Sequence, residues 1–198
     1  MDAATLFAFA VFVVIMTGTP GPGNLTFLAI GASAGYRTAL PVILASQLGS
    51  LPLKLCVAYG LGHVLSAGGP VVTGFKILSM AYMTYLAWRI VSLSVKPKGT
   101  VALPSFREGL LIHPLSPKTW AMNLVAFSTF LAGNGLGIHE NALILIAGFT
   151  LGGLVFHSLW ALAGVSILAL VGDGPLMRAI TVAMAAAMLG ATAWSLLI

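Results

Sequence analysis

The sequence predicts an all-α, polytopic membrane protein whose six transmembrane helices form two inverted repeats of three helices each. Hydrophobic residues make up 59% of the 198 residues and charged residues 7%, and the mean hydropathy is +1.06. Soluble domains carry roughly 25% charged residues, because a surface that faces water needs them. Most of the exterior of this chain is therefore expected to face lipid. The long apolar stretches and the placement of basic residues between them predict the helix number and the repeats.

Six apolar stretches are long enough to cross a bilayer, which takes about 20 residues of helix. The connections between them are short and contain Gly or Pro. The first stretch has no basic segment before it and continues into a Gly/Pro-rich segment. We therefore expect it to be retained as a helix and not removed as a signal peptide. The expected spans are residues 3–34, 39–61, 71–93, 109–132, 142–171 and 176–197.

Basic residues mark the connections that follow the first, third and fifth spans. They are Arg37, then Arg89, Lys96, Lys98 and Arg107, and finally Arg178. Cytoplasmic connections carry an excess of Lys and Arg, so we expect a multi-pass protein of the inner (plasma) membrane with both termini outside the cytoplasm. A cytoplasmic central connection divides six spans into two halves of opposite orientation. The expected halves are residues 1–95 and 106–198, joined by a cytoplasmic linker at 96–105.

Gly and Pro interrupt the first span at about residues 18–23 and the fourth span at about residues 113–117. Paired prolines remove backbone donors and clash with the preceding turn, so neither segment can be a continuous α-helix. Within a membrane, such backbone is tolerated only where protein buries it or where it lines a cavity. Interrupted segments in both halves indicate the binding site of a transporter, and ordinary proline kinks are the alternative.

The first interruption, Thr19-Pro20-Gly21-Pro22-Gly23-Asn24, resembles the TPGPN motif of the lysine-exporter (LysE/RhtB) superfamily of amino-acid exporters. Residues 35–37, 82–89, 106–109 and 116–120 are similar to further elements of that family's pattern, in the same order along the chain. The resemblance implies a membrane transporter that exports amino acids or amino-acid-like small solutes. It also implies that the proton motive force drives the export.

The chain departs from the family's pattern at three places. Gly23 is an additional residue before Asn24, and Ser116 stands where an Asn would precede Pro-Lys. In the second span, Ser50 follows Gly49 where family members often have an Asp. The second span therefore lacks the carboxylate that the resemblance implies and contains a lysine, at position 54, four residues later.

The candidate substrate-binding residues lie in the two interruptions or shortly after them. Asn24 is expected to N-cap the half-helix that follows the first interruption, whose unpaired N–H groups form an anion site. The Lys118 ammonium is expected to bind a substrate carboxylate or to cap carbonyls freed at the first interruption. Lys54 is instead expected to extend toward the membrane surface. The full set of candidates is Thr19, Pro20, Pro22, Asn24, Pro117, Lys118 and Asn123.

His157 is the candidate proton carrier. It lies deep in the fifth span, and histidine exchanges protons near neutral pH. A neutral histidine hydrogen-bonded between helices is the alternative. The acidic residues all lie in connections or at the edges of spans: Asp2, Glu108, Glu140 and Asp173.

Other polar and small residues inside the spans have two readings each. Gln47, Ser50 and Asn123 either line the same cavity or bridge neighbouring helices. Glycines at helical spacing are expected to let helices approach closely, within the bundle or across a homodimer. The glycine pairs are Gly31/Gly35 and Gly148/Gly152.

The sequence favours a transporter over an enzyme. It contains no catalytic or nucleotide-binding motif, and its single Cys and four His give no credible metal site, so we expect no metal and no cofactor. The net charge of +5 is attributed to the cytoplasmic connections and not to nucleic-acid binding. The expected partners are a small-molecule substrate and the lipid bilayer. A non-transporting scaffold or accessory subunit, and an exporter of a metal ion or of another solute, remain as alternatives.

Overall fold

The computed structural model describes residues 1–60, 69–95, 104–172 and 174–197, and all regular structure in these residues is helical. The linker expected at 96–105 lies mostly outside the described residues. The elements are α1 (Ala3–Gly18), α2 (Pro22–Ala34), α3 (Tyr36–Ala58), α5 (Pro70–Val95), α6 (Phe106–Ile112), α7 (Pro117–Ala126), the π-helical turn η1 (Phe127–Leu131), α8 (Ile138–Val171) and α9 (Pro175–Leu197). The all-α prediction is confirmed for this part of the chain.

The first expected span is two helices. α1 ends at Gly18, α2 begins at Pro22, and their axes are bent by 52° at the break. Pro22 occupies the first helical position, where its missing N–H group breaks no hydrogen bond of the helix. The interruption predicted at about residues 18–23 is therefore confirmed.

The fourth expected span is also broken. α6 ends at Ile112, and α7 begins at Pro117 after Ser116, whose hydroxyl accepts from the backbone N–H of Thr119. A five-residue π-helical turn, η1, follows α7. The interruption predicted at about residues 113–117 is confirmed, and the span consists of two short helices and a π-turn.

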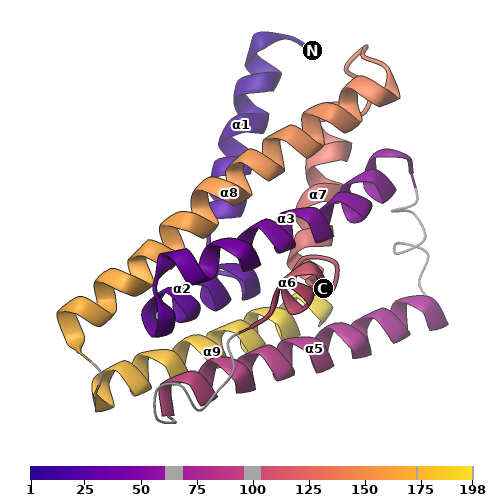
Figure 1. The fold of residues 1–198 in the computed structure, drawn as a ribbon. Helices are drawn as coiled ribbons and strands as arrows, with labels where there is room; N and C mark the ends of the chain where they lie inside the picture. The colour runs from indigo at the N-terminus through magenta and orange to yellow at the C-terminus, as the bar shows by residue number, and fades with distance from the viewer. Residues whose placement is uncertain (61–68, 96–103, 173, 198) are drawn as a thin grey trace.

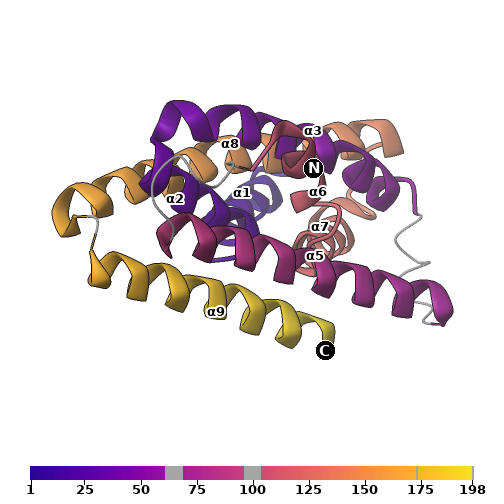
Figure 2. The same cartoon turned by 60° about the horizontal axis from the view of Figure 1, so that its bottom comes forward.

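The helices pack in two groups on either side of α2 (Figures 1 and 2). α8 runs the length of the molecule and contacts α1, α2 and α3, while α6 packs on α3. On the other side, α5 and α9 lie side by side and run in opposite directions. Residues 21–24 of the first interruption and His113 and Ser116 of the second border a cavity between α3, α7 and α8.

Three of the described helices are long and apolar enough to cross a membrane: α3, α8 and the Pro175–Trp194 part of α9. The bent pair of α1 and α2 makes a fourth candidate span. α5, a continuous helix of 26 residues, covers the third expected span but is not among these candidates. Large apolar side chains remain exposed, including Phe7 (71%) and Leu170 (86%), which suits a surface in contact with lipid.

Glycines let backbones touch where α8 crosses the other helices. A Cβ atom at Gly31 would clash with the carbonyl oxygen of Ala161, and one at Gly164 would clash with that of Leu28. α2 and α8 therefore pack backbone to backbone, as small residues permit in membrane proteins. The predicted pair Gly148 and Gly152 instead makes room for side chains of α1, because Phe9 and Val13 fill the space beside them.

We predict that Gly164→Ala destabilises the protein, because the added methyl group meets the backbone of α2 and not a movable side chain. Overpacking of this kind costs about 1–3 kcal/mol, so the melting temperature of the purified protein should fall. Gly190→Ala is the control, since nothing lies within 4 Å of that position in α9. Equal melting temperatures for the Gly164 variant and the parent would contradict the packing described here.

Candidate functional site

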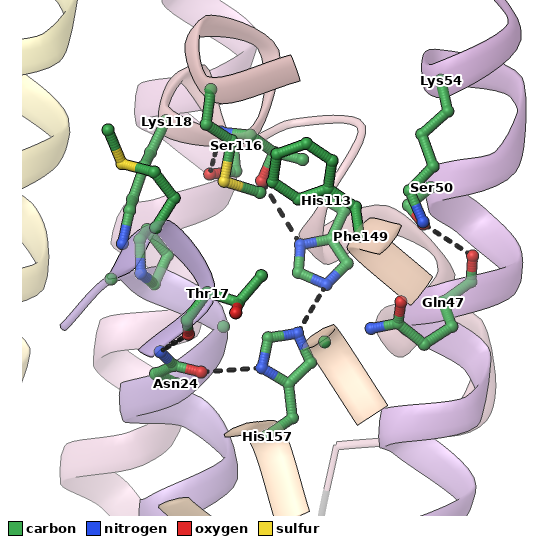
Figure 3. A pocket seen from close by; sticks show the side chains of 17 residues that line it. Thr17, Asn24, Gln47, Ser50, Lys54, His113, Ser116, Lys118, Phe149 and His157 are labelled. Atoms are coloured by element: carbon green, nitrogen blue, oxygen red, sulfur yellow. Dashed lines mark hydrogen bonds between the residues drawn. The ribbon is translucent and has the colours of Figure 1, made fainter. Parts of the chain in front are cut away.

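The two interruptions meet at one cavity (Figure 3), whose empty volume is about 460 Å³ with its open mouth included. Its walls come from α1, α2, α3, α7, α8 and the segment between α6 and α7. Among the described residues, two lysines and no carboxylate line it. The polar lining residues are Thr17, Asn24, Gln47, Ser50, Lys54, His113, Ser116, Lys118, Thr119 and His157.

Lys118 links the second interruption to the first. Its Nζ donates to the carbonyl oxygen of Thr19 at 3.0 Å, to the Thr19 hydroxyl at 2.8 Å and to the carbonyl oxygen of Pro20 at 3.2 Å. An ammonium group has three N–H donors, so all of them have a partner at the first interruption. Lys118 was expected to bind a substrate carboxylate or to cap carbonyls freed at the first interruption. In the structure its ammonium caps these carbonyls.

Asn24 does not N-cap α2, in contrast to the expectation from the sequence. α2 begins at Pro22, so the N-cap is Gly21, three residues earlier than expected, and Gly21 has no side chain to cap the helix. The Asn24 side chain folds back, and its Nδ2 donates to the carbonyl oxygens of Thr17 and Thr19, each at 2.8 Å. Asn24 therefore satisfies the end of α1 and not the start of α2.

His157 is buried and contacts a second histidine. Its Nε2 lies 3.0 Å from Nε2 of His113, and its Nδ1 lies 2.7 Å from Oδ1 of Asn24. The two imidazole rings meet edge to edge through these nitrogens, with centroids 5.1 Å apart, and the Phe27 ring contacts His157 with a centroid distance of 4.7 Å. Both histidines are less than 10% exposed, so each ring depends on these partners for its hydrogen bonds.

The hydrogen bonds assign a tautomer to each ring. Asn24 uses its amide N–H groups on carbonyls, so its oxygen faces His157 and accepts a hydrogen bond from Nδ1–H. Nε2 of a neutral His157 then accepts from Nε2–H of His113. Nδ1 of His113 is left as an acceptor for the hydroxyl of Thr119 at 3.3 Å. The result is a chain of hydrogen bonds with a single direction, from Thr119 to Asn24.

Sequence reasoning missed His113 as a partner of His157. The two residues are 44 positions apart, and no spacing rule connects them. His113 lies at the end of α6, immediately before Pro114, and it enters the cavity because the helix stops there. A histidine next to an interrupted helix was the signal available in the sequence.

Lys54 does not extend toward the membrane surface, and that expectation is wrong. The residue is 2% exposed, and its Nζ donates to the hydroxyl of Thr150 at 2.8 Å. α3 is packed against both α8 and α6, so this face of α3 points into the protein and the side chain has no route to the surface. Its ammonium lines the cavity instead.

The other candidates divide between the cavity and its support. Pro22 lines the cavity, while Thr19 and Pro20 hold Lys118 without lining it. Pro117 begins α7 and is buried. Asn123 is fully buried and does not line the cavity, and its Nδ2 donates to the carbonyl oxygen of Thr119 at 2.8 Å.

Three polar residues were expected either to line the cavity or to bridge neighbouring helices. Gln47 and Ser50 line the cavity, and Asn123 does not. In the described ranges, no group of three or more His, Cys, Asp or Glu residues lies close enough to hold a metal ion.

We predict that Lys118→Met lowers the melting temperature, because the Pro20 carbonyl loses its donor and the Thr19 carbonyl keeps only the Asn24 amide. Thr19 and Pro20 are exposed, so the loss should be close to the net value of about 0.5–1.5 kcal/mol for a typical hydrogen bond. Lys118→Arg should retain part of the stability, since its guanidinium still offers donors. The matched control is Lys76→Met, because Lys76 is exposed and lies outside the cavity. An unchanged melting temperature for Lys118→Met would rule out the capping role.

A protein of Escherichia coli (strain K12) and one of Shigella flexneri, each named cysteine/O-acetylserine efflux protein, are 31% identical to this chain over 134 residues. The alignment covers 66% of this chain and 67% of each relative. No solved structure matches the chain. Residues 14–198 match the family described as LysE type translocator. The chain therefore belongs to the LysE type translocator family and is a membrane transporter, not an enzyme.

Proposed function

We propose that this protein exports amino acids or closely similar solutes through the cavity described above. The observation that carries the proposal is that both interrupted helices meet at one polar cavity inside an apolar helical protein. Such interruptions are where transporters bind their substrates. The relatives named for cysteine and O-acetylserine efflux make these two compounds the first substrates to test.

The proposed arrangement has six spans in two inverted repeats, residues 1–95 and 106–198, with both termini outside the cytoplasm. The two interruptions support it, because each follows the first helix of one half. The halves would rock against each other around the cavity, opening it first to the cytoplasm and then to the outside. The proposed substrate-binding part of the cavity lies where the two halves meet. It is lined by Pro22, Asn24 and Lys118. The residues that support it are Thr19, Pro20, Pro117 and Asn123.

We further propose that His157 and His113 together carry the proton that couples export to the proton motive force. A proton added at Nδ1 of His113 keeps the bond between the two rings, and the Thr119 hydroxyl then accepts where it donated before. The uncharged pair and the pair with one added proton therefore share one geometry. Lys54 and Lys118 are the charged groups that face the pair.

The export proposal predicts that proteoliposomes containing the protein lose labelled cysteine or O-acetylserine faster than liposomes without protein. A panel of further amino acids and divalent metal ions, loaded in the same way, separates the alternatives. Efflux of metal ions alone would replace the proposal with metal export. Absence of efflux for the whole panel, with correctly folded protein, would favour the scaffold or accessory subunit.

The coupling proposal predicts that His157→Gln and His113→Gln abolish transport against a substrate gradient driven by a pH gradient. Exchange of substrate for substrate, which needs no net proton movement, should survive in both variants. His139→Gln is the matched control, because His139 is exposed at the start of α8 and does not line the cavity. If both cavity variants still use the pH gradient, the pair is structural and the proton moves elsewhere.

A further inference from the structure

The two lysines of the cavity differ in what their ammonium groups can still bind. Lys118 has a partner for each of its three donors at the first interruption. Lys54 has one partner among the described residues, the neutral hydroxyl of Thr150. Two N–H donors of Lys54 are therefore available to another group. A buried charge with so few partners is costly unless an opposite charge or further hydrogen bonds accompany it.

Gln47 presents a second donor without a partner. The side chain is 6% exposed, and its Nε2 has no hydrogen-bond partner in the described part of the chain. Figure 3 shows the amide pointing into the cavity, between α3 and the histidine pair. Gly153 of α8 leaves the space that the amide occupies, because a Cβ atom there would lie 2.6 Å from Nε2. Buried amide groups in folded proteins rarely lack a partner, so Gln47 also indicates a ligand.

These donors lie on one face of α3. Gln47, Ser50 and Lys54 are three, four and seven positions apart, a spacing that places them on the same side of a helix. The Ser50 hydroxyl donates to the carbonyl oxygen of Gln47 at 2.7 Å, so it accepts rather than donates toward the cavity. No carboxylate among the described residues lines the cavity to neutralise Lys54.

We infer that Lys54 and Gln47 form the subsite for the carboxylate of the transported solute. The inference rests on the proposed function for the existence of a transported solute, and it names the group that the cavity recognises. A carboxylate supplies the negative charge that Lys54 lacks and accepts from Nε2 of Gln47 with its second oxygen. Lys118 belongs to the scaffold of the first interruption and does not bind the carboxylate.

The test compares ligands that differ in the carboxylate alone. L-cysteine, cysteine methyl ester and cysteamine are titrated into purified protein in lipid nanodiscs under reducing conditions. Hydrogen bonds to charged groups contribute about 1.5–3 kcal/mol, so the parent should bind cysteine about 10- to 100-fold more tightly than the two compounds without a carboxylate. Lys54→Met should remove this preference and leave the affinity for the methyl ester unchanged. Gln47→Leu should reduce the preference in the same direction, and Lys76→Met should retain it.

The ratio of the affinity for cysteine to that for the two ligands without a carboxylate separates carboxylate recognition from folding. Misfolded protein would bind all three ligands less and leave this ratio unchanged. Equal weakening of cysteine and its methyl ester in Lys54→Met would make Lys54 structural and overturn the inference. Undiminished preference for cysteine in that variant would place the carboxylate elsewhere.

Propionate is titrated in parallel as a carboxylate without an amino group. Binding of propionate that depends on Lys54, without binding or export of any amino acid, would retain the subsite and refute the export proposal. Absence of propionate and cysteine binding by the folded parent would refute the subsite.

Discussion

The backbone at the first interruption needs hydrogen-bond partners, and the rest of the cavity depends on how it obtains them. Pro20 and Pro22 end α1 early, so the carbonyls of its last turn have no helical partner inside an apolar protein. Three side chains satisfy carbonyls at this interruption. The Asn24 amide donates to those of Thr17 and Thr19, the Lys118 ammonium to those of Thr19 and Pro20, and the Trp160 indole to that of Gly18. Lys118 comes from the second interruption, so one interruption stabilises the other. Their meeting creates the cavity.

The same hydrogen bonds determine what remains for chemistry. Because Asn24 donates its amide protons to carbonyls, its oxygen is committed to His157, and this orders the protons on both histidines. Because Lys118 is committed to the backbone, Lys54 is the cation of the cavity that retains unused donors. The cavity therefore combines the histidine pair with one lysine of α3 whose ammonium has unused donors. These two features support the proposals of a proton carrier and of a solute that bears a carboxylate.

Close packing allows this polar interior to exist in an apolar chain. The backbones of α2 and α8 touch at Gly31 and Gly164, and α3 meets α6 in the same way at Gly49, where a Cβ atom would clash with the carbonyl oxygen of Leu110. These contacts bring His157 of α8 within reach of Asn24 on α2, and they keep Lys54 away from the lipid. Glycine acts here through the space it leaves and not through backbone flexibility.

The sequence by itself determined the helical class, the two interruptions and the family, because apolar length, paired prolines and the motif at 19–24 are local properties of the chain. It also placed Lys118, Asn24 and His157 among the candidate site residues, and the structure brings all three to the cavity. Their partners were decided by the tertiary structure: Asn24 turned away from its expected N-cap role, and Lys54 was buried. His113 joined His157 from 44 positions away. Hydropathy indicates whether a segment can lie in a membrane. The packing of α3 against α6 and α8 decides which way the side chains of α3 face. Long-range contacts of this kind have no periodic signature in a single sequence.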